Sequence, residues 1–223
     1  MSDLAILVPV LGRPHRVAPL LDSIESTTPG ARVLFLADPN DLDEIAAITG
    51  EQRSLRRPFS VDLETTGGNY AEKIGRGVSL TSEPLVFTGA DDLEPKPGWY
   101  EAAKARCMVE GVEVVGVNDL IDRRPARAEH ATHFLMTRKY AEQPCIDGSP
   151  GPFFTGYDHS WCDNELIATA TARGVYGYAA DAHVRHEHPM NETAPDDDVY
   201  RKGRAQFHQD RRIFQGRVIL WSR

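Results

Sequence analysis

Apolar runs alternate along the first part of the chain with segments of helical periodicity. The run Leu4–Val10 is wholly apolar and Arg32–Ala37 is nearly so, which predicts two strands buried on both faces. Between them, apolar residues recur at helical spacing from Val17 to Ile24, and Pro29-Gly30 ends that segment. The chain therefore opens with a strand, a helix and a second strand.

The same alternation continues to about residue 92. Helical patterns cover Leu42–Ile48 and Tyr70–Leu80, with a short strand-like run at Phe59–Leu63 between them. A fourth apolar run, Pro84–Thr88, follows. Strands that alternate with helices in this way predict a parallel sheet that is covered by helices on both faces.

Beyond residue 95 the elements follow a less regular order. We expect helices over Trp99–Val109, Asp163–Arg173 and Val199–Phe214. We expect strands over Val112–Val117, Thr132–Thr137, Tyr176–Ala180, Ala182–Arg185 and Val218–Trp221. The Gly- and Pro-rich segment 146–155 is predicted to be a loop, and the acidic segment 193–198 is expected to be mobile.

These elements predict one α/β domain over residues 1–223 with a mostly parallel sheet. We expect a nucleotide-type half over residues 1–95 and a second half over residues 96–190. Residues 191–223 form a mobile segment and a C-terminal helix. No internal repeat or low-complexity linker divides the chain.

Charge and cysteine content narrow the class of protein. The net charge of −8 argues against a general nucleic-acid binder, which usually carries a basic field. Three scattered cysteines form neither a metal-binding motif nor a disulfide framework, which favours a reducing compartment. The N-terminus lacks a signal-peptide pattern, and no apolar run approaches the roughly 20 residues of a membrane span. We expect a cytoplasmic protein without a membrane span.

Two adjacent acids, Asp91 and Asp92, follow the fourth predicted strand. In open α/β sheets, ligands bind at the carboxyl edge, where such residues lie. Neighbouring carboxylates repel one another unless a cation is close, and hard divalent cations take oxygen ligands. The pair therefore suggests a metal that holds a phosphorylated ligand, with a solvated turn as the alternative.

Candidate nucleotide contacts come before the paired acids. Asp38 follows the second strand, where an acid can accept hydrogen bonds from a ribose or a base, or form a turn before Pro39. Lys73 and Arg76 share one helical face and can meet a diphosphate, or they can be solvated surface cations. No G-x-G-x-x-G fingerprint follows the first strand, so NAD binding has little support.

Later candidates are an acid at a helix start and two histidines. Asp163 can be a helix N-cap or a general base, and Glu165 is its nearby competitor. His186 and His188 point the same way in an extended segment, which allows a metal pair or one metal ligand with one phosphate contact. A chance pair in a strand is the alternative. His183, on the opposite face, is a weaker candidate.

Basic and aromatic side chains complete the candidates. Three basic side chains of the C-terminal helix can close over a bound phosphate as a lid, or they can form the exposed face of that helix: Arg201, Lys202 and Arg204. Four aromatic side chains of segment 146–162 can stack against an acceptor, or they can be part of the hydrophobic core: Phe153, Phe154, Tyr157 and Trp161.

Taken in order, these groups resemble the family 2 type of GT-A glycosyltransferases. The resemblance runs from Ile6 to about Pro189. It rests on Val8-Pro9-Val10 with Arg13, the Asp38 position, Gly68-Asn69 to Gly77, Phe87 to Asp92, Cys162-Asp163-x-x-Leu166 and His186. It implies a hexosyltransferase-type enzyme that moves a sugar from a nucleoside diphosphate sugar, with a UDP-sugar as the expected donor, to an acceptor hydroxyl with inversion.

The resemblance also implies residue roles. The nucleotide would be framed by Pro9, Arg13 and Asp38, with Lys73, Arg76 and Asp92 nearby. A Mn²⁺ or Mg²⁺ ion would be bound by Asp91 and His186, with His188 as a further candidate ligand. Asp163 would be the base that deprotonates the acceptor, which makes residues 96–190 the acceptor or catalytic half and residues 1–95 the nucleotide-binding half.

The sequence departs from the family pattern at Gly89. The usual motif is Asp-x-Asp, and Gly89-Ala90-Asp91 lacks its first acid, for which Asp92 can compensate. The acid pair usual before the base is here Cys162-Asp163.

Two other functions stay open from the sequence. Nucleotidyl transfer needs a Gly-rich basic loop after the first strand, and the segment from Gly12 to Arg16 is a weak match. A non-catalytic sugar-nucleotide-binding or interaction protein is consistent with Gly89. A histidine-based metal hydrolase is disfavoured because the helical H-E-x-x-H motif is absent. The acceptor, which can be a protein, a glycan or a small molecule, and the oligomeric state are not determined by the sequence.

Overall fold

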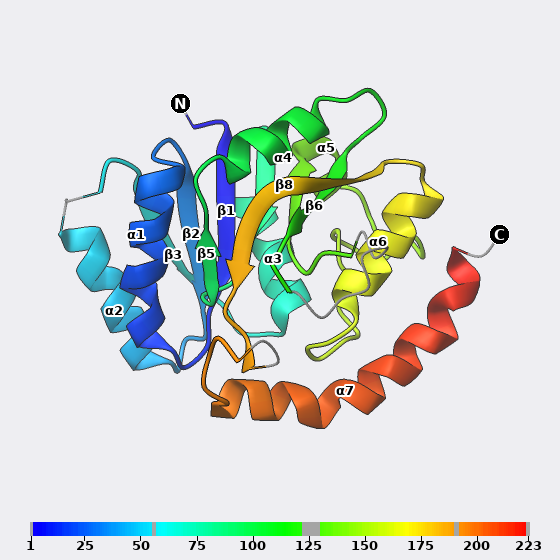
Figure 1. The fold of residues 1–223 in the computed structure, drawn as a ribbon. Helices are drawn as coiled ribbons and strands as arrows, with labels where there is room; N and C mark the ends of the chain where they lie inside the picture. Colours follow the sequence, from blue (N-terminus) through cyan, green and yellow to red (C-terminus); the bar gives the residue numbers. More distant parts are fainter. Residues whose placement is uncertain (1, 55–56, 122–129, 190–191, 222–223) are drawn as a thin grey trace.

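A computed structural model of the protein describes residues 2–54, 57–121, 130–189 and 192–221. Within these ranges, one eight-stranded sheet lies between two layers of helices (Figure 1). This is the single α/β unit expected from the alternating pattern. Met1 lies outside the described residues. So do residues 190 and 191, where the predicted acceptor half meets the predicted C-terminal segment.

The sheet has the strand order β3-β2-β1-β4-β7-β6-β8-β5. Its first half is parallel and consists of β1 (Leu4–Pro9), β2 (Arg32–Ala37), β3 (Ser60–Thr65) and β4 (Leu85–Thr88). Its second half is mixed and consists of β5 (Leu93–Pro95), β6 (Val114–Asn118), β7 (Phe134–Thr137) and β8 (Tyr176–His186). Strand β7 is antiparallel to both of its neighbours, β8 is parallel to β6, and β5 is antiparallel to β8.

Each face of the sheet packs against its own layer of helices. One layer contains α1 (Val17–Thr27), α2 (Leu42–Arg53) and α4 (Trp99–Cys107). The other contains α3 (Tyr70–Leu80), α5 (Arg138–Ala141) and α6 (Cys162–Ala172). Because side chains alternate along a strand, Ile6 and Val8 of β1 pack into the first layer while Ala5 and Leu7 pack into the second. The apolar run of β1 is buried for this reason.

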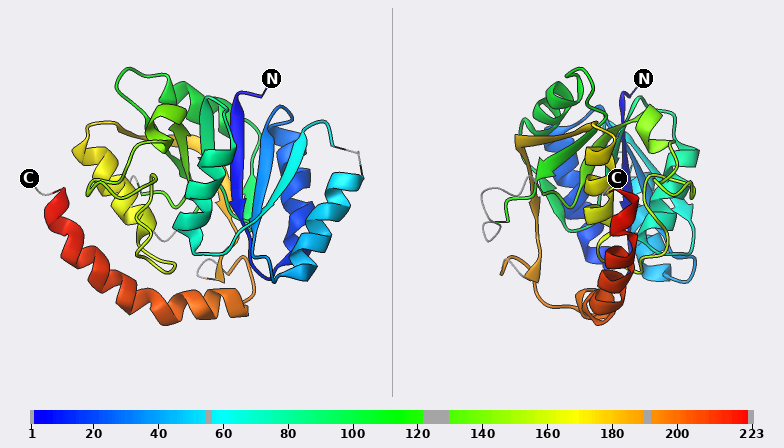
Figure 2. Two further views of the ribbon diagram at one scale, coloured as in Figure 1. Left: turned by 180° about the vertical axis from the view of Figure 1, so that it is seen from behind. Right: turned by 90° about the vertical axis from the view of Figure 1, so that its right-hand side faces the viewer.

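A long polar helix, α7 (Asp198–Arg217), lies outside these layers. It passes the carboxyl ends of the central strands and then runs beside α6 (Figures 1 and 2). Two short 3₁₀ helices, η1 (Pro14–Arg16) and η3 (Val218–Leu220), follow β1 and α7 respectively. Within the described ranges, none of the helices has both the length and the apolar character needed to cross a bilayer.

The start of α3 is fixed by a capping box. The Asn69 side chain accepts the Glu72 N–H at 3.0 Å, and the Glu72 carboxylate accepts the Asn69 N–H at 2.8 Å. The Asn69 amide also donates to the carbonyls of Thr155 and Tyr157, at 2.8 and 2.9 Å. This cap thereby joins the first turn of α3 to the loop that leads to α6.

Most of the predicted helices and strands are present in the structure, with differences at the C-terminal end and around β8. The expected strand Val218–Trp221 is wrong, because α7 continues into η3, where the side chains of Val218 and Ile219 are 38% and 62% exposed. The two short strands expected between residues 176 and 185 form the single strand β8. The sequence did not predict β5, η1 or α5.

Candidate active site

A cavity of about 560 Å³ opens at the carboxyl edge of the sheet. Its walls come from the ends of β1, β4 and β8, the first turns of α3 and α6, and the first half of α7. The lining includes the following sequence-predicted residues: Pro9, Arg13, Lys73, Asp91, Asp92, Asp163, His186 and His188. A cavity of this size suits a small-molecule ligand.

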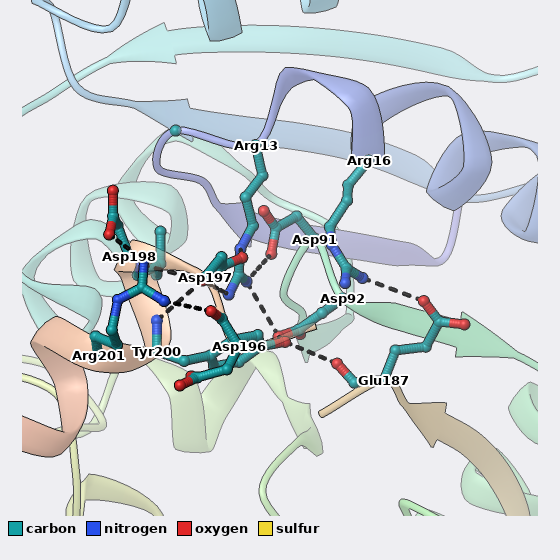
Figure 3. Close-up of polar contacts among 12 residues, drawn as sticks. Arg13, Arg16, Asp91, Asp92, Glu187, Asp196, Asp197, Asp198, Tyr200 and Arg201 are labelled. Carbon is teal, nitrogen blue, oxygen red and sulfur yellow. Dashed lines mark hydrogen bonds and ion pairs between the residues drawn. The ribbon is translucent and has the colours of Figure 1, made fainter. Parts of the chain in front are cut away.

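The paired acids are buried beside an arginine. Asp91 is 7% exposed, Asp92 5% and Arg13 4%. The Nη1 atom of Arg13 donates to Asp91 Oδ1 at 3.1 Å and to Asp92 Oδ2 at 3.3 Å (Figure 3). Its Nε and Nη2 atoms donate to the two carboxylate oxygens of Asp197, at 2.8 and 3.1 Å. One guanidinium therefore pairs with three carboxylates, and its single positive charge balances only part of theirs.

The two acids differ in their surroundings. The Tyr200 hydroxyl lies 2.8 Å from Asp92 Oδ2, and His186 Nε2 lies 3.5 Å from Asp92 Oδ1. Burial alone would raise the pKa of Asp92, but nearby His186 and the Tyr200 hydroxyl hold it below the usual range of an aspartate. Burial and the neighbouring charge of Asp92 raise the pKa of Asp91 above that range. The negative charge of the pair therefore resides mainly on Asp92.

The pair has unused capacity for a cation. Asp91 Oδ2 and Asp92 Oδ1 are buried and lack a hydrogen-bond partner within the described part of the chain. Carboxylate oxygens and imidazole nitrogens form a donor set that suits Mn²⁺, and carboxylates alone suit Mg²⁺. In the described ranges, no three side chains of His, Cys, Asp or Glu lie close enough together to bind one metal ion by themselves. The residues present thus fit a divalent ion that takes further ligands from a diphosphate and water.

Three histidine rings line up beside the acids. The ring centroids of His133 and His186 are 5.3 Å apart, and those of His186 and His188 are 5.2 Å apart. His133 Nδ1 lies 2.9 Å from the Thr88 carbonyl; because a carbonyl only accepts, Nδ1 carries the proton and Nε2 is free of one in the neutral ring. Burial lowers the pKa of His133 to about 4 and that of His188 to about 4. Both rings are therefore neutral at pH 7.

Asp163 lies in the first turn of α6 and also faces this cavity. The N-cap is Trp161, so Asp163 does not have the capping role that was one of its two predicted alternatives. Asp163 Oδ2 lies 3.2 Å from His130 Nε2, and the Asp163 side chain is 20% exposed. Its carboxylate is thus reachable from the cavity.

Glu165, the predicted competitor of Asp163, is fully engaged elsewhere. Its two oxygens accept hydrogen bonds from Arg217 at 2.6 and 2.8 Å, and the Tyr157 hydroxyl donates to it at 2.6 Å. Its side chain is only 5% exposed. Glu165 therefore anchors α7 to α6 and leaves Asp163 as the candidate base.

The structure separates the predicted nucleotide contacts. Lys73 lines the cavity, and its Nζ donates to the Val10 carbonyl at 3.0 Å, while burial lowers its pKa. Asp38 accepts the Asn40 N–H at 2.9 Å, which is the turn alternative, and it is not a lining residue. Arg76 is exposed and pairs with Glu64 at 2.6 Å. Of the three, only Lys73 is brought to the acids' cavity.

Arg201 and Arg204, two of the predicted lid residues, lie on the exposed side of α7. Arg201 pairs with Asp198, and Arg204 pairs with Asp196 at 2.7 Å. Neither arginine lines the cavity. Their cationic groups therefore stabilise the start of α7 in this structure.

Several solved structures share this fold at low sequence identity. A mannosyltransferase, PcManGT from Pyrobaculum calidifontis in complex with GDP-Man and Mn²⁺, superposes with a TM-score of 0.69 at 14% identity, over 98% of this chain and 69% of that one. Residues 1–349 of TarS from S. aureus give a TM-score of 0.63 at 13% identity, over 86% and 62% of the two chains. Glucosyl-3-phosphoglycerate synthase from Mycobacterium tuberculosis, with Mn²⁺, UDP-glucose and phosphoglyceric acid, gives 0.61 at 18% identity, over 97% and 80%.

The chain has the GT-A fold. The expected fold class is thereby confirmed. No family model matches the sequence, and the search of curated protein sequences gave no match.

This GT-A chain has a steric reason for glycine in place of the usual first acid. The Gly89 N–H donates to the Leu7 carbonyl at 2.7 Å. A Cβ atom at Gly89 would lie 3.1 Å from that carbonyl oxygen and 3.4 Å from a methyl group of Val8. A side chain at this position, directly after β4, would therefore fit only if β1 gave way by a few tenths of an ångström, and the acids of the site are Asp91 and Asp92.

Four site residues of this GT-A chain were missed by sequence reasoning. Glu44 is fully buried and accepts the Arg13 N–H at 2.7 Å. Asp197, Tyr200 and Asp210 come from α7 and its N-cap. Asp197 is the N-cap of α7, and its Oδ1 accepts the N–H groups of residues 199 and 200. The sequence pattern started this helix at Val199 and so gave Asp198, not Asp197, the N-cap position.

Proposed function

We propose that the protein is a glycosyltransferase that moves a sugar from a nucleoside diphosphate sugar to an acceptor hydroxyl. The observation that carries the proposal is the buried Asp91–Asp92 pair in the same cavity as the accessible Asp163. Asp91 Oδ2 has no hydrogen-bond partner in the described part of the chain, and Asp92 Oδ1 faces His186 Nε2 at 3.5 Å. The GT-A relatives solved with GDP-Man and with UDP-glucose support this class of donor. A UDP-sugar remains the expected donor.

The acidic pair and the neighbouring imidazoles would hold a Mn²⁺ or Mg²⁺ ion. Asp91 and Asp92 offer the oxygens. His186 and His188 line the same cavity, and either ring would have to move toward the acids to become a ligand, since no three such side chains converge in the described ranges. When bound, the ion would supply positive charge that stabilises the departing diphosphate. Lys73 and Arg13 line the same cavity and would contribute further positive charge on the donor side.

Asp163 is the proposed general base. Its carboxylate would take the proton of the acceptor hydroxyl while the acceptor oxygen attacks the anomeric carbon. Attack from the face opposite to the leaving diphosphate is a single displacement, which inverts the anomeric centre. His130, 3.2 Å from Asp163 Oδ2, would orient the carboxylate.

A non-catalytic sugar-nucleotide-binding protein is the second candidate function. The observation that favours it is the placement of Arg13, whose guanidinium already pairs with Asp91 and Asp92 and occupies the cationic position beside them. Such a protein would bind a nucleotide without an essential role for Asp163. Nucleotidyl transfer would share the binding step but would release pyrophosphate.

A panel of nucleoside diphosphates and sugar nucleotides, each with and without Mn²⁺ or Mg²⁺, tests the proposal by thermal shift. Ligand at about 100 times its Kd stabilises the native state by about 2.7 kcal/mol. We expect one nucleotide to raise the melting temperature in a metal-dependent way, and Asp91→Ala to abolish that shift. No shift with any member of the panel would refute the proposal and the second candidate together.

Asp163→Asn then separates the candidates, with Asp181→Asn, an exposed acid of β8, as its matched control. We expect Asp163→Asn to keep the nucleotide shift and to lower sugar transfer by about 10²–10⁴-fold. The Asp181→Asn variant should transfer sugar at the wild-type rate. Binding without measurable transfer by the wild type would favour the non-catalytic candidate, and pyrophosphate release would favour nucleotidyl transfer.

A further inference from the structure

The inner face of α7 holds the loop of residues 158–160. Asp210 of α7 is fully buried. Its Oδ1 accepts the Asp158 N–H at 3.0 Å, and its Oδ2 accepts the N–H groups of His159 and Ser160 at 3.0 and 2.8 Å. A carboxylate has two acceptor oxygens and a charge, so it can satisfy three consecutive amides that no neutral side chain of this size can satisfy equally well.

A second contact on the same face of α7 acts on the same loop. Gly203 lies two helical turns before Asp210 and is buried. A Cβ atom at Gly203 would lie 2.5 Å from Cδ2 of His159, so the helix backbone packs directly against that ring. Hydrogen bonding at Asp210 and close packing at Gly203 therefore fix the loop at two points.

This loop leads directly into the helix that bears the candidate base. Ser160 is followed by Trp161, which is the N-cap of α6 and has a left-handed φ of 72°. The Trp161 ring packs against Phe207 and Phe214 of α7, at centroid distances of 5.5 and 5.0 Å. Asp163 lies two residues beyond Trp161, so the path of this loop determines where its carboxylate lies.

We infer that Asp210 is a positioning residue that places Asp163 against the acceptor by fixing the backbone of residues 158–160. The inference rests on the proposed transferase function. Asp158 and His159 themselves line the cavity beside Asp163. A loose loop would therefore disturb the acceptor side of the site, whereas Asp91 and Asp92 on the donor side are held by Arg13.

Asp210→Asn is the first test, with Asp198→Asn as the matched control on the same helix. Asp198 is exposed and pairs with Arg201 on the surface. Amide hydrogen exchange at residues 158–160 should become about 10-fold faster in Asp210→Asn, because the amide side chain loses acceptor capacity and places its own N–H₂ group among donors. The control should exchange as the wild type does.

The kinetic readout separates positioning from general destabilisation. We expect kcat for sugar transfer to fall by about 10–100-fold in Asp210→Asn, as small misplacements of a catalytic group do. Nucleotide affinity in the presence of Mn²⁺ should stay within about twofold, because the donor-side contacts are intact. A parallel loss of nucleotide affinity and kcat, or unchanged exchange at 158–160, would overturn the inference.

Gly203→Ala provides a second variant if Asp210→Asn does not fold. Alanine has a higher helix propensity than glycine, so the substitution should not destabilise α7 itself. The new methyl group displaces the His159 ring, and we expect a similar fall in kcat with nucleotide affinity retained. Wild-type kcat in this variant, with the His159 ring displaced, would count against positioning through the loop.

Failure of the inference and failure of the proposed function give different results. A wild-type protein that binds nucleotide but transfers no sugar would refute the transferase and with it the role of Asp163. An active wild type whose Asp210→Asn variant retains full kcat would refute the positioning role alone.

Discussion

Arg13 and Asp197 lie 184 positions apart in the chain and form a two-bonded ion pair, with Nε–Oδ2 and Nη2–Oδ1 distances of 2.8 and 3.1 Å. Asp197 is at the same time the N-cap of α7. Burial opposes the charge of Arg13, but Asp197, Asp91 and Asp92 raise its pKa well above the ordinary value, so it stays charged. The start of α7 and the charge balance of the acidic pair thus depend on one guanidinium.

Arg13→Met should destabilise the protein by about 3–5 kcal/mol, because it leaves buried carboxylates without their cation. Saturating Mn²⁺ should restore part of this loss, since a divalent ion at Asp91 and Asp92 replaces the missing positive charge. Urea unfolding of the wild type and the variant, each with and without Mn²⁺, measures both effects.

The control for Arg13→Met is Arg32→Met. Arg32 pairs with Asp62 at 2.6 Å, but the two side chains are 29% and 37% exposed. An exposed pair of this kind contributes about 0–1 kcal/mol and should give no response to Mn²⁺. Equal losses in the two variants would contradict the role assigned to Arg13.

Gly89→Ala should cost about 1–3 kcal/mol of stability, because the new methyl group lies 3.1 Å from the Leu7 carbonyl in a buried strand that has little room to shift. Gly30→Ala is the matched control, since no heavy atom lies within 4 Å of a Cβ built there. Thermal unfolding of both variants tests the prediction. If the two melt together, crowding is not the reason for glycine at this position.

The buried His133 should make the protein less stable in weak acid. Burial lowers the pKa of His133 from 6.5 to about 4, so between these values the unfolded state binds a proton that the folded state does not. Stability contributed by this group is therefore complete above pH 6.5 and falls as the pH decreases toward 4, by up to about 3 kcal/mol.

His133→Leu tests this slope, with His183→Leu as the control at an exposed histidine of β8. Between pH 7.5 and pH 5, the free energy of unfolding should fall by about 2 kcal/mol less in His133→Leu than in the wild type. The control should keep the wild-type slope. The same slope in all three proteins would show that His133 does not titrate as its burial implies.

Elements with a strong local pattern were predictable from the sequence. The strand β2 and the helix α3 have the predicted bounds, since an apolar run defines the first and helical periodicity defines the second. Strand β5 was missed because three residues that include Pro95 carry no periodic signal, and only pairing with β8 makes them a strand. The predicted strand Val218–Trp221 is wrong because apolar content alone does not separate a strand from the end of a helix.

The only part of the candidate site that the sequence predicted is the part that follows from ligand binding at the carboxyl edge of α/β sheets. Asp91 and Asp92 follow β4 and so fall at the carboxyl edge, where the structure has the cavity. Helix α7 supplies partners that are distant in the sequence. Tyr200 contacts Asp92, which is 108 positions away, and Asp210 contacts Asp158, which is 52 positions away. Such long-range pairs leave no pattern in a single sequence.

The way α7 is attached has a consequence for partial unfolding. Of its 20 residues, Tyr200, Gly203 and Asp210 are the buried ones. It is held by polar contacts at its two ends and at Asp210, and by partly buried aromatic packing against Trp161. A segment with so little apolar burial can open at a free energy well below that of the whole sheet. In mild denaturant, the cavity would therefore lose one wall, and with it the ligand, while the eight-stranded sheet remains folded.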